Sequence, residues 1–359
     1  MINIKKVILP ILIGVSMFIK IDSLHAYDNL NIENIDGTPN EISNELNNRY
    51  FKQSDEIVLI GGGSMYDSVS VSPLAFLKNA PVVVNKSSNM GNLTRKYIDN
   101  SNVKKVTIVG GYSAVSWETE QLLVKKGISV ERIHGQDRYA TSLNIARKIY
   151  RQQEFDKAFL ISDKIGFENA ISIYAYAAKN NYPIIWVSSD DVESSLDFLE
   201  SKSLKKIYML GVEDIMTSDM ISKYDNLESL DTMGQTTTNI DLINELYSKD
   251  SYDKLYTANM VFGPNFKNYD YMSLGVIAAK EDIPILVVNE TFSKSHEKFL
   301  DSKKVKTLIE IGKKVEPYSA KDFFSGRTFV SVCVLSAIIV VLVFRAIKFE
   351  AINVKRNKI

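Results

Sequence analysis

The sequence contains very few of the residues on which disulfide frameworks, metal sites and acid–base catalysis depend. Of its 359 residues only one is cysteine, Cys333, and three are histidine, at positions 25, 134 and 296. A single cysteine excludes an intramolecular disulfide and a zinc site built from several cysteines. The histidines have no neighbours at metal-ligand spacing, so we predict no metal site and no cofactor.

Motifs for nucleotide binding and nucleophilic catalysis are also missing. Gly61-Gly62-Gly63 precedes a predicted helix, but it matches neither the dinucleotide fingerprint nor the P-loop, and a tight turn explains it better. There is no G-x-S-x-G elbow. The neighbouring acids Asp190 and Asp191 open a predicted polar helix, whose dipole favours negative charge there. We therefore predict a protein without catalytic activity.

The net charge of zero hides two basic ends and an acidic middle. Residues 1–26 carry a net charge of +2 and residues 345–359 carry +4, which leaves the segment between them at −6. A mildly acidic body does not attract the phosphates of nucleic acid, so we exclude a nucleic-acid partner. For the same reason, its overall charge gives no attraction to other anionic polymers.

The first 26 residues have the composition of a signal peptide. Lys5 and Lys6 precede an apolar run of 13 residues, and the small Ala26 stands where a signal peptidase cleaves. A helix of that length reaches about 20 Å, less than the roughly 30 Å hydrocarbon core of a bilayer. We predict a cleaved signal peptide over residues 1–26. An uncleaved anchor is the alternative, because Lys20 directly follows the apolar run.

A longer apolar run lies near the other end of the chain. The 17 residues from Thr328 to Phe344 carry no charge, which is the lower limit for a spanning helix. Five cations and one anion follow, a balance typical of the cytoplasmic side. We predict a linker over residues 319–327, a transmembrane helix over 328–344 and a basic cytoplasmic tail over 345–359. The protein is then a single-pass cell-membrane protein with an extracytoplasmic body.

Between these ends the sequence repeats with a period of about one hundred residues. Prolines that precede an apolar strand recur at Pro81, Pro183 and Pro284, spaced by 102 and 101 residues. Glycines that end another strand recur at positions 110, 211 and 312, spaced by 101 and 101 residues. This regularity predicts three repeats, at residues 27–127, 128–226 and 227–318.

Each repeat is expected to be a small α/β domain with three strands. The first strands are expected at Ile57–Ile60, Ala158–Ile161 and Leu255–Ala258, and the third strands at Lys105–Val109, Lys206–Leu210 and Lys306–Ile311. Polar helices are expected at Asn92–Asn100, Glu193–Ser201 and Ser293–Asp301. Apolar strands that alternate with helices predict a parallel sheet with helices on both faces, a three-layer Rossmann-like or flavodoxin-like unit. The short, apolar linkers predict that the three units pack together.

A polar pattern follows the first strand of every repeat. It reads Asp67-x-x-Ser70, Asn169-x-x-Ser172 and Asp270-x-x-Ser273. Open α/β sheets bind ligands at the carboxyl ends of their strands, so these side chains are candidates for ligand binding. The structural alternative, which we favour for each residue taken singly, is a helix cap worth about 1 kcal/mol.

One stretch resembles the signature of a known family. Arg132-Ile-His-Gly-Gln-Asp-Arg-Tyr-Ala-Thr-Ser-Leu-Asn-Ile-Ala146 is similar to the Arg-x-x-Gly-x-Asp-Arg-Tyr-x-Thr-Ala-x-x-Ile-Ala opening of the type-2 cell-wall-binding repeat. That repeat occurs in surface proteins of Gram-positive bacteria, especially clostridia. Residues 66–75 and 106–116 also match it, and the resemblance spans roughly residues 34–318. Its most specific part is Asp137-Arg138-Tyr139.

The resemblance implies both a fold and a function. Family members arrange three Rossmann-like repeats around a pseudo-threefold axis and bind an anionic secondary cell-wall polymer non-covalently. Their Pro-Ile-Leu-Leu stretch is implicated in attachment and corresponds here to the segments that begin at the three prolines. The resemblance therefore adds Asp137, Arg138, Tyr139 and the prolines to the candidate ligand-binding residues. For Arg138, the structural alternative is an ion pair with Asp137 or with a carboxylate of another repeat.

This sequence also departs from the family pattern. The Asp-Arg-Tyr signature is intact only in the second repeat, and the corresponding segments begin at Gly37 and Gly234 in the other two. A membrane anchor would also retain the protein at the surface without wall attachment. A second hypothesis is therefore a scaffold or accessory subunit of a cell-envelope protein assembly that no longer binds polymer. A third is a polymer-modifying enzyme, which would need an acid–base pair that the repeats do not visibly supply.

Overall fold

The computed structural model describes residues 29–51, 54–86, 89–164, 167–212, 215–230, 239–260, 271–288 and 291–315. The chain divides after Val315 into two units, and every described residue lies in the first of them. The predicted signal peptide, linker, transmembrane helix and tail all lie outside these residues. No helix within the described ranges combines the length and the apolar character needed to cross a bilayer.

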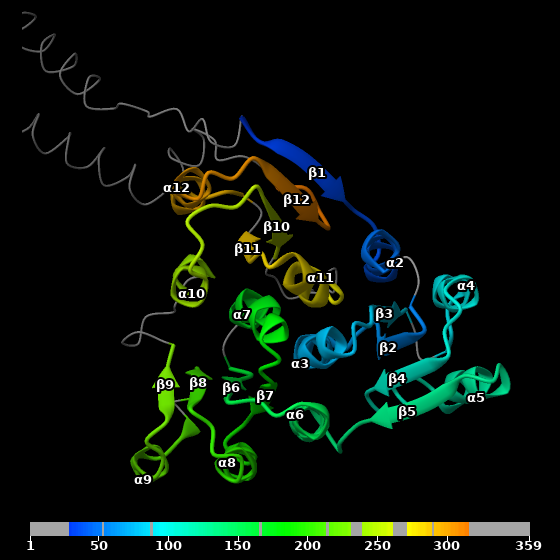
Figure 1. Ribbon diagram of the computed structural model, residues 1–359, viewed down its shortest axis with the longest axis horizontal. Coiled ribbons are helices and arrows are strands. Elements are labelled where there is room, and N and C mark those ends of the chain that lie inside the picture. Colours follow the sequence, from blue (N-terminus) through cyan, green and yellow to red (C-terminus); the bar gives the residue numbers. More distant parts are fainter. Residues whose placement is uncertain are drawn as a thin grey trace, which may run out of the picture. The chain divides into compact units, whose positions relative to one another are not determined.

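Three parallel sheets of four strands each form the framework (Figure 1). The first sheet has the order β3-β2-β4-β5, with β2 (Glu56–Gly61), β3 (Val82–Asn85), β4 (Lys105–Val109) and β5 (Ser129–Ile133). The second has the order β7-β6-β8-β9, with β6 (Lys157–Ser162), β7 (Ile184–Val187), β8 (Lys206–Leu210) and β9 (Leu227–Ser229). The third has the order β1-β12-β10-β11, with β1 (Asn31–Ile35), β10 (Lys254–Asn259), β11 (Ile285–Val288) and β12 (Thr307–Ile311). The expected parallel α/β architecture is confirmed.

Helices connect the strands and cover the sheets. Three follow the first strand of each repeat: α3 (Met65–Leu77), α7 (Phe167–Lys179) and α11 (Leu274–Glu281). The polar helices are α4 (Asn92–Asn100), α8 (Val192–Glu200) and α12 (Lys294–Ser302), each within one residue of its expected position. Three more are the first helices of the repeats: α2 (Pro39–Tyr50), α6 (Arg138–Gln152) and α10 (Asn239–Leu246). The remaining two, α5 (Trp117–Lys125) and α9 (Ser218–Ser222), follow the third strands.

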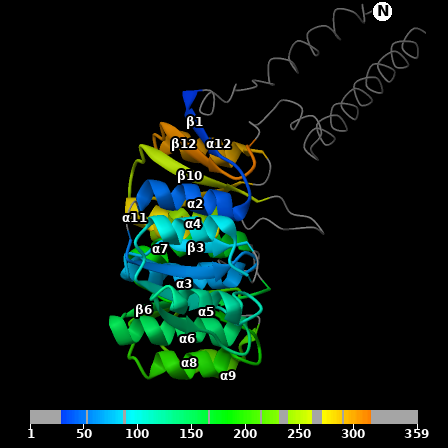
Figure 2. The ribbon, with the colours of Figure 1, turned by 90° about the vertical axis from the view of Figure 1, so that its right-hand side faces the viewer.

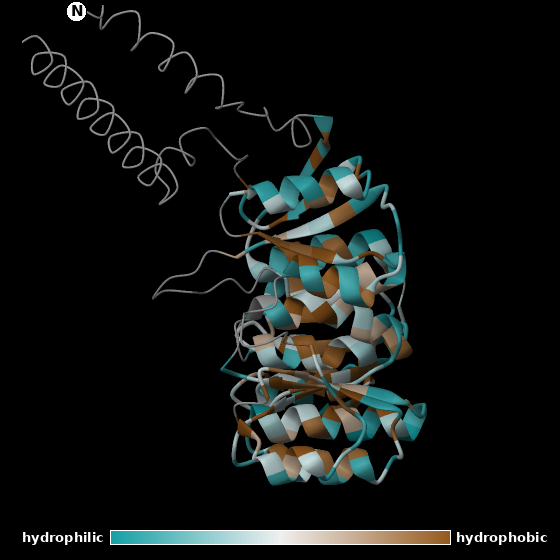
Figure 3. Cartoon of the chain, turned by 90° about the vertical axis from the view of Figure 1, so that its left-hand side faces the viewer, coloured by the Kyte–Doolittle hydropathy of each residue, from teal (hydrophilic) through white to brown (hydrophobic). Residues whose placement is uncertain are grey.

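Side chains that alternate along β2 show why both faces of the first sheet are covered. Val58 and Ile60 join the large apolar core that also holds α2 and α3, whereas Ile57 and Leu59 join a separate core with α4 and α5. All four are fully buried, as expected for a strand with a helix layer on each side. In Figure 3 the apolar residues accordingly concentrate where helices and sheets face each other.

The fourth strand of each sheet comes from the neighbouring repeat. β5 and β9 stand at the starts of the predicted second and third repeats, yet they pair with β4 and β8 of the preceding sheets. β1, near the start of the first repeat, pairs with β12 of the last, from Asn31 opposite Thr307 to Ile35 opposite Ile311. The three sequence repeats therefore interlock, and the first closes onto the third.

The strand that follows each repeated proline lies at a sheet edge. Its free backbone groups form hydrogen bonds with a side chain from the first helix of its own repeat. Ser43 of α2 donates a hydrogen bond to the carbonyl of Val82 (3.1 Å) and accepts one from the N–H of Val84 (3.3 Å). Equivalent bonds join Ser142 to Trp186 and Asn239 to both Ile285 and Val287. Figure 2 shows α2 and α4 beside β3. An open edge strand would invite aggregation, so this helix is part of the sheet's protection.

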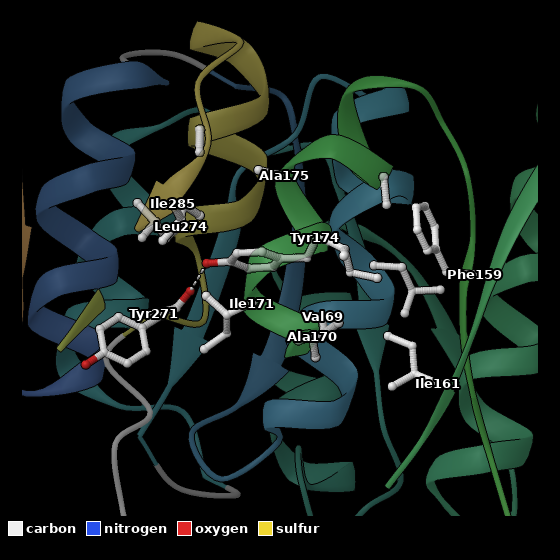
Figure 4. Close-up of a cluster of buried hydrophobic side chains, with 14 of the residues drawn as sticks. Val69, Phe159, Ile161, Ala170, Ile171, Tyr174, Ala175, Tyr271, Leu274 and Ile285 are labelled. Carbon is white, nitrogen blue, oxygen red and sulfur yellow. Dashed lines mark hydrogen bonds between the residues drawn. The ribbon is translucent and has the colours of Figure 1, made fainter. Parts of the chain in front are cut away.

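The helices α3, α7 and α11 contact one another at the centre of the three repeats. Gly275 of α11 lies where they meet: a Cβ there would come within 2.4 Å of the Tyr174 ring and 2.8 Å of Ser72 Oγ. Tyr174, fully buried, donates a hydrogen bond to the carbonyl of Tyr271 (2.9 Å; Figure 4). Each central helix also packs against the first helix of the next repeat: α3 with α6, α7 with α10 and α11 with α2. Equivalent contacts thus occur at all three seams, as a pseudo-threefold arrangement requires.

Candidate functional site at the carboxyl ends of the strands

Three loops meet at the carboxyl end of the first sheet, after β2, β3 and β4. Asn85, at the end of β3, accepts a hydrogen bond from Gly62 N–H on its carbonyl (2.6 Å) and one from Gly91 N–H on Oδ1 (3.0 Å). Ser116, which precedes α5, donates to Asn89 Oδ1 (3.1 Å). These bonds fix the loops to one another and give this end of the sheet a defined shape.

The run of glycines in the first loop allows that close approach. Ser64 N–H bonds the carbonyl of Gly61 (3.1 Å), so the predicted tight turn is confirmed. A Cβ at Gly61 would lie 2.7 Å from the carbonyl oxygen of Ala114, and one at Gly62 would lie 3.0 Å from that of Asn85. The first two glycines are therefore explained by the packing of neighbouring loops, without a phosphate ligand.

Asp67 lies beneath the glycine that ends β4. A Cβ at Gly110 would come within 3.1 Å of Asp67 Oδ2, and Gly110 has a φ of +100°, which also favours glycine. Burial raises the pKa of Asp67 to about 6, although a hydrogen bond with Ser64 lowers it. Ser64 occupies the N-cap position of α3, so the prediction that Asp67 caps the helix is wrong; its carboxylate lies in the first turn.

The corresponding positions of the other repeats differ from Asp67. Asn169 is buried, and its Oδ1 has no hydrogen-bond partner among the described residues. Asp270 lies outside those residues. Ser172 accepts a hydrogen bond from Asn239 Nδ2 across the seam with the third repeat (2.7 Å), whereas the hydroxyls of Ser70 and Ser273 have no described partner. A carboxylate under the strand ends is thus observed in the first repeat, and a neutral amide replaces it in the second.

The Asp-Arg-Tyr signature lies at the seam between the first and second repeats. Asp137 caps α6 by accepting a hydrogen bond from the N–H of Ala140 (2.8 Å). Tyr139 donates its hydroxyl hydrogen to Asp163 Oδ2 (2.5 Å), in the loop after β6. This hydrogen bond, together with burial, raises the pKa of Tyr139 to about 12. Two of the three signature residues therefore stabilise the start of α6 and the loop beside it.

Arg138 reaches across the seam. Its guanidinium carbon lies 4.2 Å from the centre of the Tyr66 ring of the first repeat, which is a cation–π contact. Its nearest carboxylate in the described structure is Asp163, at 3.7 Å and in the same repeat. The expected partners, Asp137 or a carboxylate of another repeat, are therefore wrong. The Arg138 side chain remains 45% exposed, so part of the guanidinium faces solvent.

Trp186 of β7 packs against Tyr66 at the same seam. It is 1% exposed, its ring meets Tyr66 edge-on at 4.8 Å, and its Nε1 donates to the carbonyl of Tyr66 (3.1 Å). Tyr66 is consequently held between a buried indole and the guanidinium of Arg138. The sequence pattern pointed to Arg138 but not to Tyr66 and Trp186, because these two residues belong to α3 and β7, which lie far from Arg138 in the sequence.

The three candidate prolines lie inside the protein. Pro81, Pro183 and Pro284 are all buried, each directly before an edge strand. The carbonyls of Pro81 and Pro183 accept hydrogen bonds from Val58 and Phe159 of the adjacent strands (both 2.9 Å). Buried rings cannot touch a polymer, so any contribution of the prolines to attachment acts through the position of the edge strand.

A small cavity lies over the first of these edge strands, between α2 and α4. Its volume is about 10 Å³, and Asn47 Oδ1 and Thr94 Oγ1, both buried, have no partner among the described residues. That volume suits one water molecule, which would satisfy both oxygens. A sugar ring would not fit, so the cavity is not the candidate ligand site.

Side chains at the amino ends of the strands form closed polar networks. In the first repeat Glu56 pairs with Lys78 and with Lys105 (3.3 Å). In the third, Glu281 pairs with Lys254 and accepts hydrogen bonds from the hydroxyls of Tyr256 (2.6 Å) and Tyr50 (3.2 Å). Tyr50 belongs to α2, so this network also joins the first repeat to the third.

Neither histidine of the described structure shows the surroundings of a metal ligand. His296 accepts a hydrogen bond from Ser293 N–H (3.0 Å) in the capping box of α12. His134 is exposed and bonds weakly to the neighbouring Gly135 carbonyl. Within the described ranges, no three His, Cys, Asp or Glu side chains cluster closely enough to hold a metal ion.

Exposed aromatic side chains at the rim of the first sheet escaped the sequence reasoning. Tyr112 and Trp117, in the loop after β4 and at the start of α5, are each 54% exposed. A signal was available, since the corresponding residues of the second repeat are Glu213 and Ser218. The second repeat has polar residues where the first has these two aromatic residues. The exposed aromatic pair is therefore not a general feature of the repeated fold.

Comparison with protein families gives one family match. Residues 34–120 and 132–221 match the model of cell wall binding domain 2 (CWB2). These segments contain three complete strands of the first sheet, β2, β3 and β4, and three of the second, β6, β7 and β8. The resemblance noted in the sequence is therefore confirmed for the first two repeats.

Two curated proteins with similar sequences come from Bacillus subtilis. The N-acetylmuramoyl-L-alanine amidase LytC of Bacillus subtilis is 25% identical over 278 residues, which cover 77% of this chain and 53% of LytC. The amidase enhancer of the same organism is 31% identical over 150 residues, 42% of this chain and 21% of the enhancer. The chain thus spans about half or less of these relatives.

Solved structures with the same fold come from Clostridium difficile. Cwp8 shares 29% identity at a TM-score of 0.67, with 80% of this chain and 50% of Cwp8 covered. Cwp6 shares 24% identity at a TM-score of 0.68, with 80% of this chain and 46% of Cwp6 covered. The likeness to Cwp6 shows the fold alone.

Proposed function

From the premise that residues 34–120 and 132–221 belong to the cell wall binding domain 2 family, we propose that this chain attaches non-covalently to an anionic secondary polymer of the cell wall. The family match over two repeats carries the proposal. The protein acts by binding and not by catalysis, because the matched segments correspond to a binding domain. In this proposal, residues 1–26 direct export and residues 328–344 anchor the chain in the membrane.

Arg138 is the residue best suited to meet an anionic group of the polymer. It lies at the carboxyl ends of the strands, where open α/β sheets bind ligands. Tyr66 supports its guanidinium, and Asp163 at 3.7 Å lies beyond hydrogen-bond distance, so N–H donors remain for a phosphate or carboxylate. The overall acidity of the body makes such a local cation necessary for binding an anion.

Sedimentation with cell walls tests the proposal. The full-length chain, kept in mild detergent, is mixed with walls purified from the cells that produce it, either native or stripped of anionic polymers by hydrofluoric acid. We expect the chain to sediment with native walls and to stay in solution with stripped walls. Equal sedimentation with both preparations would refute polymer binding.

A matched pair of variants tests the part of Arg138. Arg138→Ala should lower the affinity for native walls about fivefold to tenfold, because a charge-assisted hydrogen bond to the polymer is lost. Arg151→Ala, an exposed change in the last turn of the same helix, should have no effect. If Arg138→Ala lowers the unfolding temperature without weakening binding below it, the role of Arg138 is structural.

A second candidate function is a scaffold in a cell-envelope protein assembly. It is favoured by the absence of an arginine corresponding to Arg138 in the first and third repeats. In the first repeat, the corresponding helix α2 begins with Pro39, after Thr38. Cross-linking of the full-length chain in intact cells would identify membrane proteins bound to it. Specific membrane partners together with no preference for native over stripped walls would support this candidate over the first.

A further inference from the structure

Exposed apolar side chains gather on one short segment of the first repeat. Among the described residues, five large apolar side chains are exposed, and four of them lie between positions 112 and 124. These four are Tyr112 (54% exposed), Trp117 (54%), Leu122 (38%) and Val124 (50%). Exposed apolar groups that cluster on an otherwise polar surface mark binding sites.

Tyr112 is held in place by a buried arginine. The guanidinium carbon of Arg132 lies 4.4 Å from the centre of the Tyr112 ring, and the Arg132 side chain is only 7% exposed. Arg132 in turn donates to the carbonyls of Gly110 (2.7 Å) and Val115 (2.9 Å) and pairs with Glu120 (2.7 Å). The loop and its ring are therefore arranged before any ligand arrives, which lowers the entropic cost of binding.

Hydrogen bonds of Ser116 also fix the backbone at Trp117. It is the first residue of α5, directly after Ser116, whose hydroxyl accepts the N–H of Thr119 (3.2 Å) and donates to Asn89 of the loop after β3 (3.1 Å). The indole therefore stands at the carboxyl ends of the strands, on the same loop as Tyr112. Its exposure cannot be attributed to a loosely attached segment.

The aromatic pair belongs to the first repeat alone. Counted from the glycine that ends the third strand, Tyr112 and Trp117 correspond to Glu213 and Ser218 in the second repeat. In the third repeat the first of these positions holds Lys314, and the second, Ser319, lies in the predicted linker. An apolar pair needed for packing would also be expected in the second repeat, where α9 begins at Ser218, so the pair points to a ligand.

We propose that Tyr112 and Trp117 form a platform on which sugar rings of the wall polymer stack. A pyranose ring presents C–H groups on its faces and hydroxyls at its edges, so its face can cover an aromatic ring while its hydroxyls reach polar atoms. The phenol and indole supply both an apolar face and a hydrogen-bonding edge. This inference rests on the proposed wall binding and assigns its sugar contacts to the first repeat.

The size of the patch favours a sugar over a protein partner. A stable protein interface buries about 800 Å² on each side. Such an interface takes about 20–30 residues from each partner, whereas this loop and nine-residue helix present four exposed apolar side chains. Each of the two rings can stack against one sugar ring, and a polymer can add further contacts along its length.

Wall binding by matched variants is the first half of the test. Full-length Trp117→Ala should bind native walls about tenfold more weakly, and Tyr112→Ala should weaken binding to a similar degree. Trp117→Phe should retain most binding, because it keeps an aromatic face. Val124→Ala, an equally exposed apolar change on the same helix, should bind like the parent. Thermal unfolding of each variant checks that its fold is kept.

Tryptophan fluorescence is the second half. The chain has two tryptophans, and Trp186 is 1% exposed whereas Trp117 is 54% exposed. Iodide therefore quenches mainly Trp117. Soluble polymer released from native walls by dilute acid should protect the parent from quenching, and the Trp117→Phe variant should show no such change.

The outcomes separate the inference from the function on which it rests. If the parent prefers native walls but Trp117→Ala binds equally well and polymer leaves quenching unchanged, the platform is refuted and wall binding stands. If Val124→Ala weakens binding as much as Trp117→Ala, the patch is a general apolar contact and the platform is refuted. If the parent fails to distinguish native from stripped walls, the proposed function itself falls.

Discussion

The amino and carboxyl ends of the strands differ in how their side chains are paired and exposed. At the amino ends, the charges of Glu56 and Glu281 are matched by lysines and tyrosine hydroxyls in compact networks. At the carboxyl ends, Arg138 is half-exposed and Trp117 stands in solvent, while the carboxyl group of Asp67 has a raised pKa. The networks at the amino ends thus stabilise the fold. At the carboxyl ends, groups such as Asp137 and Tyr139 also stabilise it, while Arg138 and Trp117 remain partly exposed to a ligand.

The same contrast appears between seams of the repeats. The seam of the third and first repeats is closed by a strand pair, β1 with β12, and by Tyr50 in the network of Glu281. The seam of the first and second repeats has the equivalent strand pair, β5 with β4, and in addition places Arg138 over Tyr66 with part of the guanidinium exposed. The two seams therefore share their strand pairing but differ in the side chains beside it, which form a hydrogen-bonded network around Glu281 at one seam and leave the guanidinium of Arg138 partly exposed at the other.

A substitution where the three central helices meet should destabilise the whole fold, and with it both the amino and the carboxyl ends of the strands. Gly275→Ala places a Cβ 2.4 Å from the Tyr174 ring where α3, α7 and α11 meet. We expect the free energy of unfolding to fall by about 3 kcal/mol, because three packed helices must move apart. Urea denaturation followed by circular dichroism measures this loss.

The control for that substitution is Gly63→Ala. Nothing lies within 4 Å of a Cβ at Gly63, so stability should change by no more than about 0.5 kcal/mol. A Gly275→Ala protein as stable as the parent would show that the central helices are not closely packed there.

A substitution at the amino end should lower stability and spare binding. Glu281→Ala removes the carboxylate that binds Lys254 and the hydroxyl of the buried Tyr256. We expect a loss of about 2 kcal/mol in the free energy of unfolding, with wall binding unchanged at temperatures where the protein is folded. Glu281→Gln keeps a hydrogen-bond acceptor and should lose less. Reduced wall binding by folded Glu281→Ala would contradict the division between the two ends.

A substitution at the carboxyl end should raise stability in a pH-dependent way. The pKa of Asp67 is raised to about 6 in the folded protein, so its charged form opposes folding. The parent should gain stability as the pH falls from about 7 towards 4, and the neutral Asp67→Asn should be more stable by about 2 kcal/mol at pH 7.5. Urea midpoints of both proteins at pH 7.5 and pH 4 measure the difference, which should vanish at pH 4. Equal stability at pH 7.5 would exclude a buried charge.

Much of the fold followed from the apolar pattern of the sequence. The third strands Lys105–Val109 and Lys206–Leu210 were predicted with the observed bounds, because fully buried strands are short, continuous apolar runs. The strands β1, β5 and β9 were missed, since segments such as Ser129–Ile133 are partly polar and exposed at a sheet edge. Their pairing with a neighbouring repeat depends on tertiary contacts that no local pattern records.

The candidate site was predictable only in part. The signature around Asp137 could be read as a site, and the helix cap that Asp137 forms agrees with its position before an amphipathic helix. The ring that supports Arg138 belongs to another repeat, so its identity required the fold. The exposure of Trp117 was overlooked although the polar Ser218 at the corresponding position was a signal, because aromatic residues are more often buried than solvent-exposed.

Hydrogen exchange of the full-length chain, with and without soluble wall polymer, tests the division between the two ends most directly. We predict slower exchange of the amides in residues 110–119 and around Arg138 when polymer is present, with no change at the starts of β2 and β10. Slower exchange at those strand starts, with none in residues 110–119, would contradict the account.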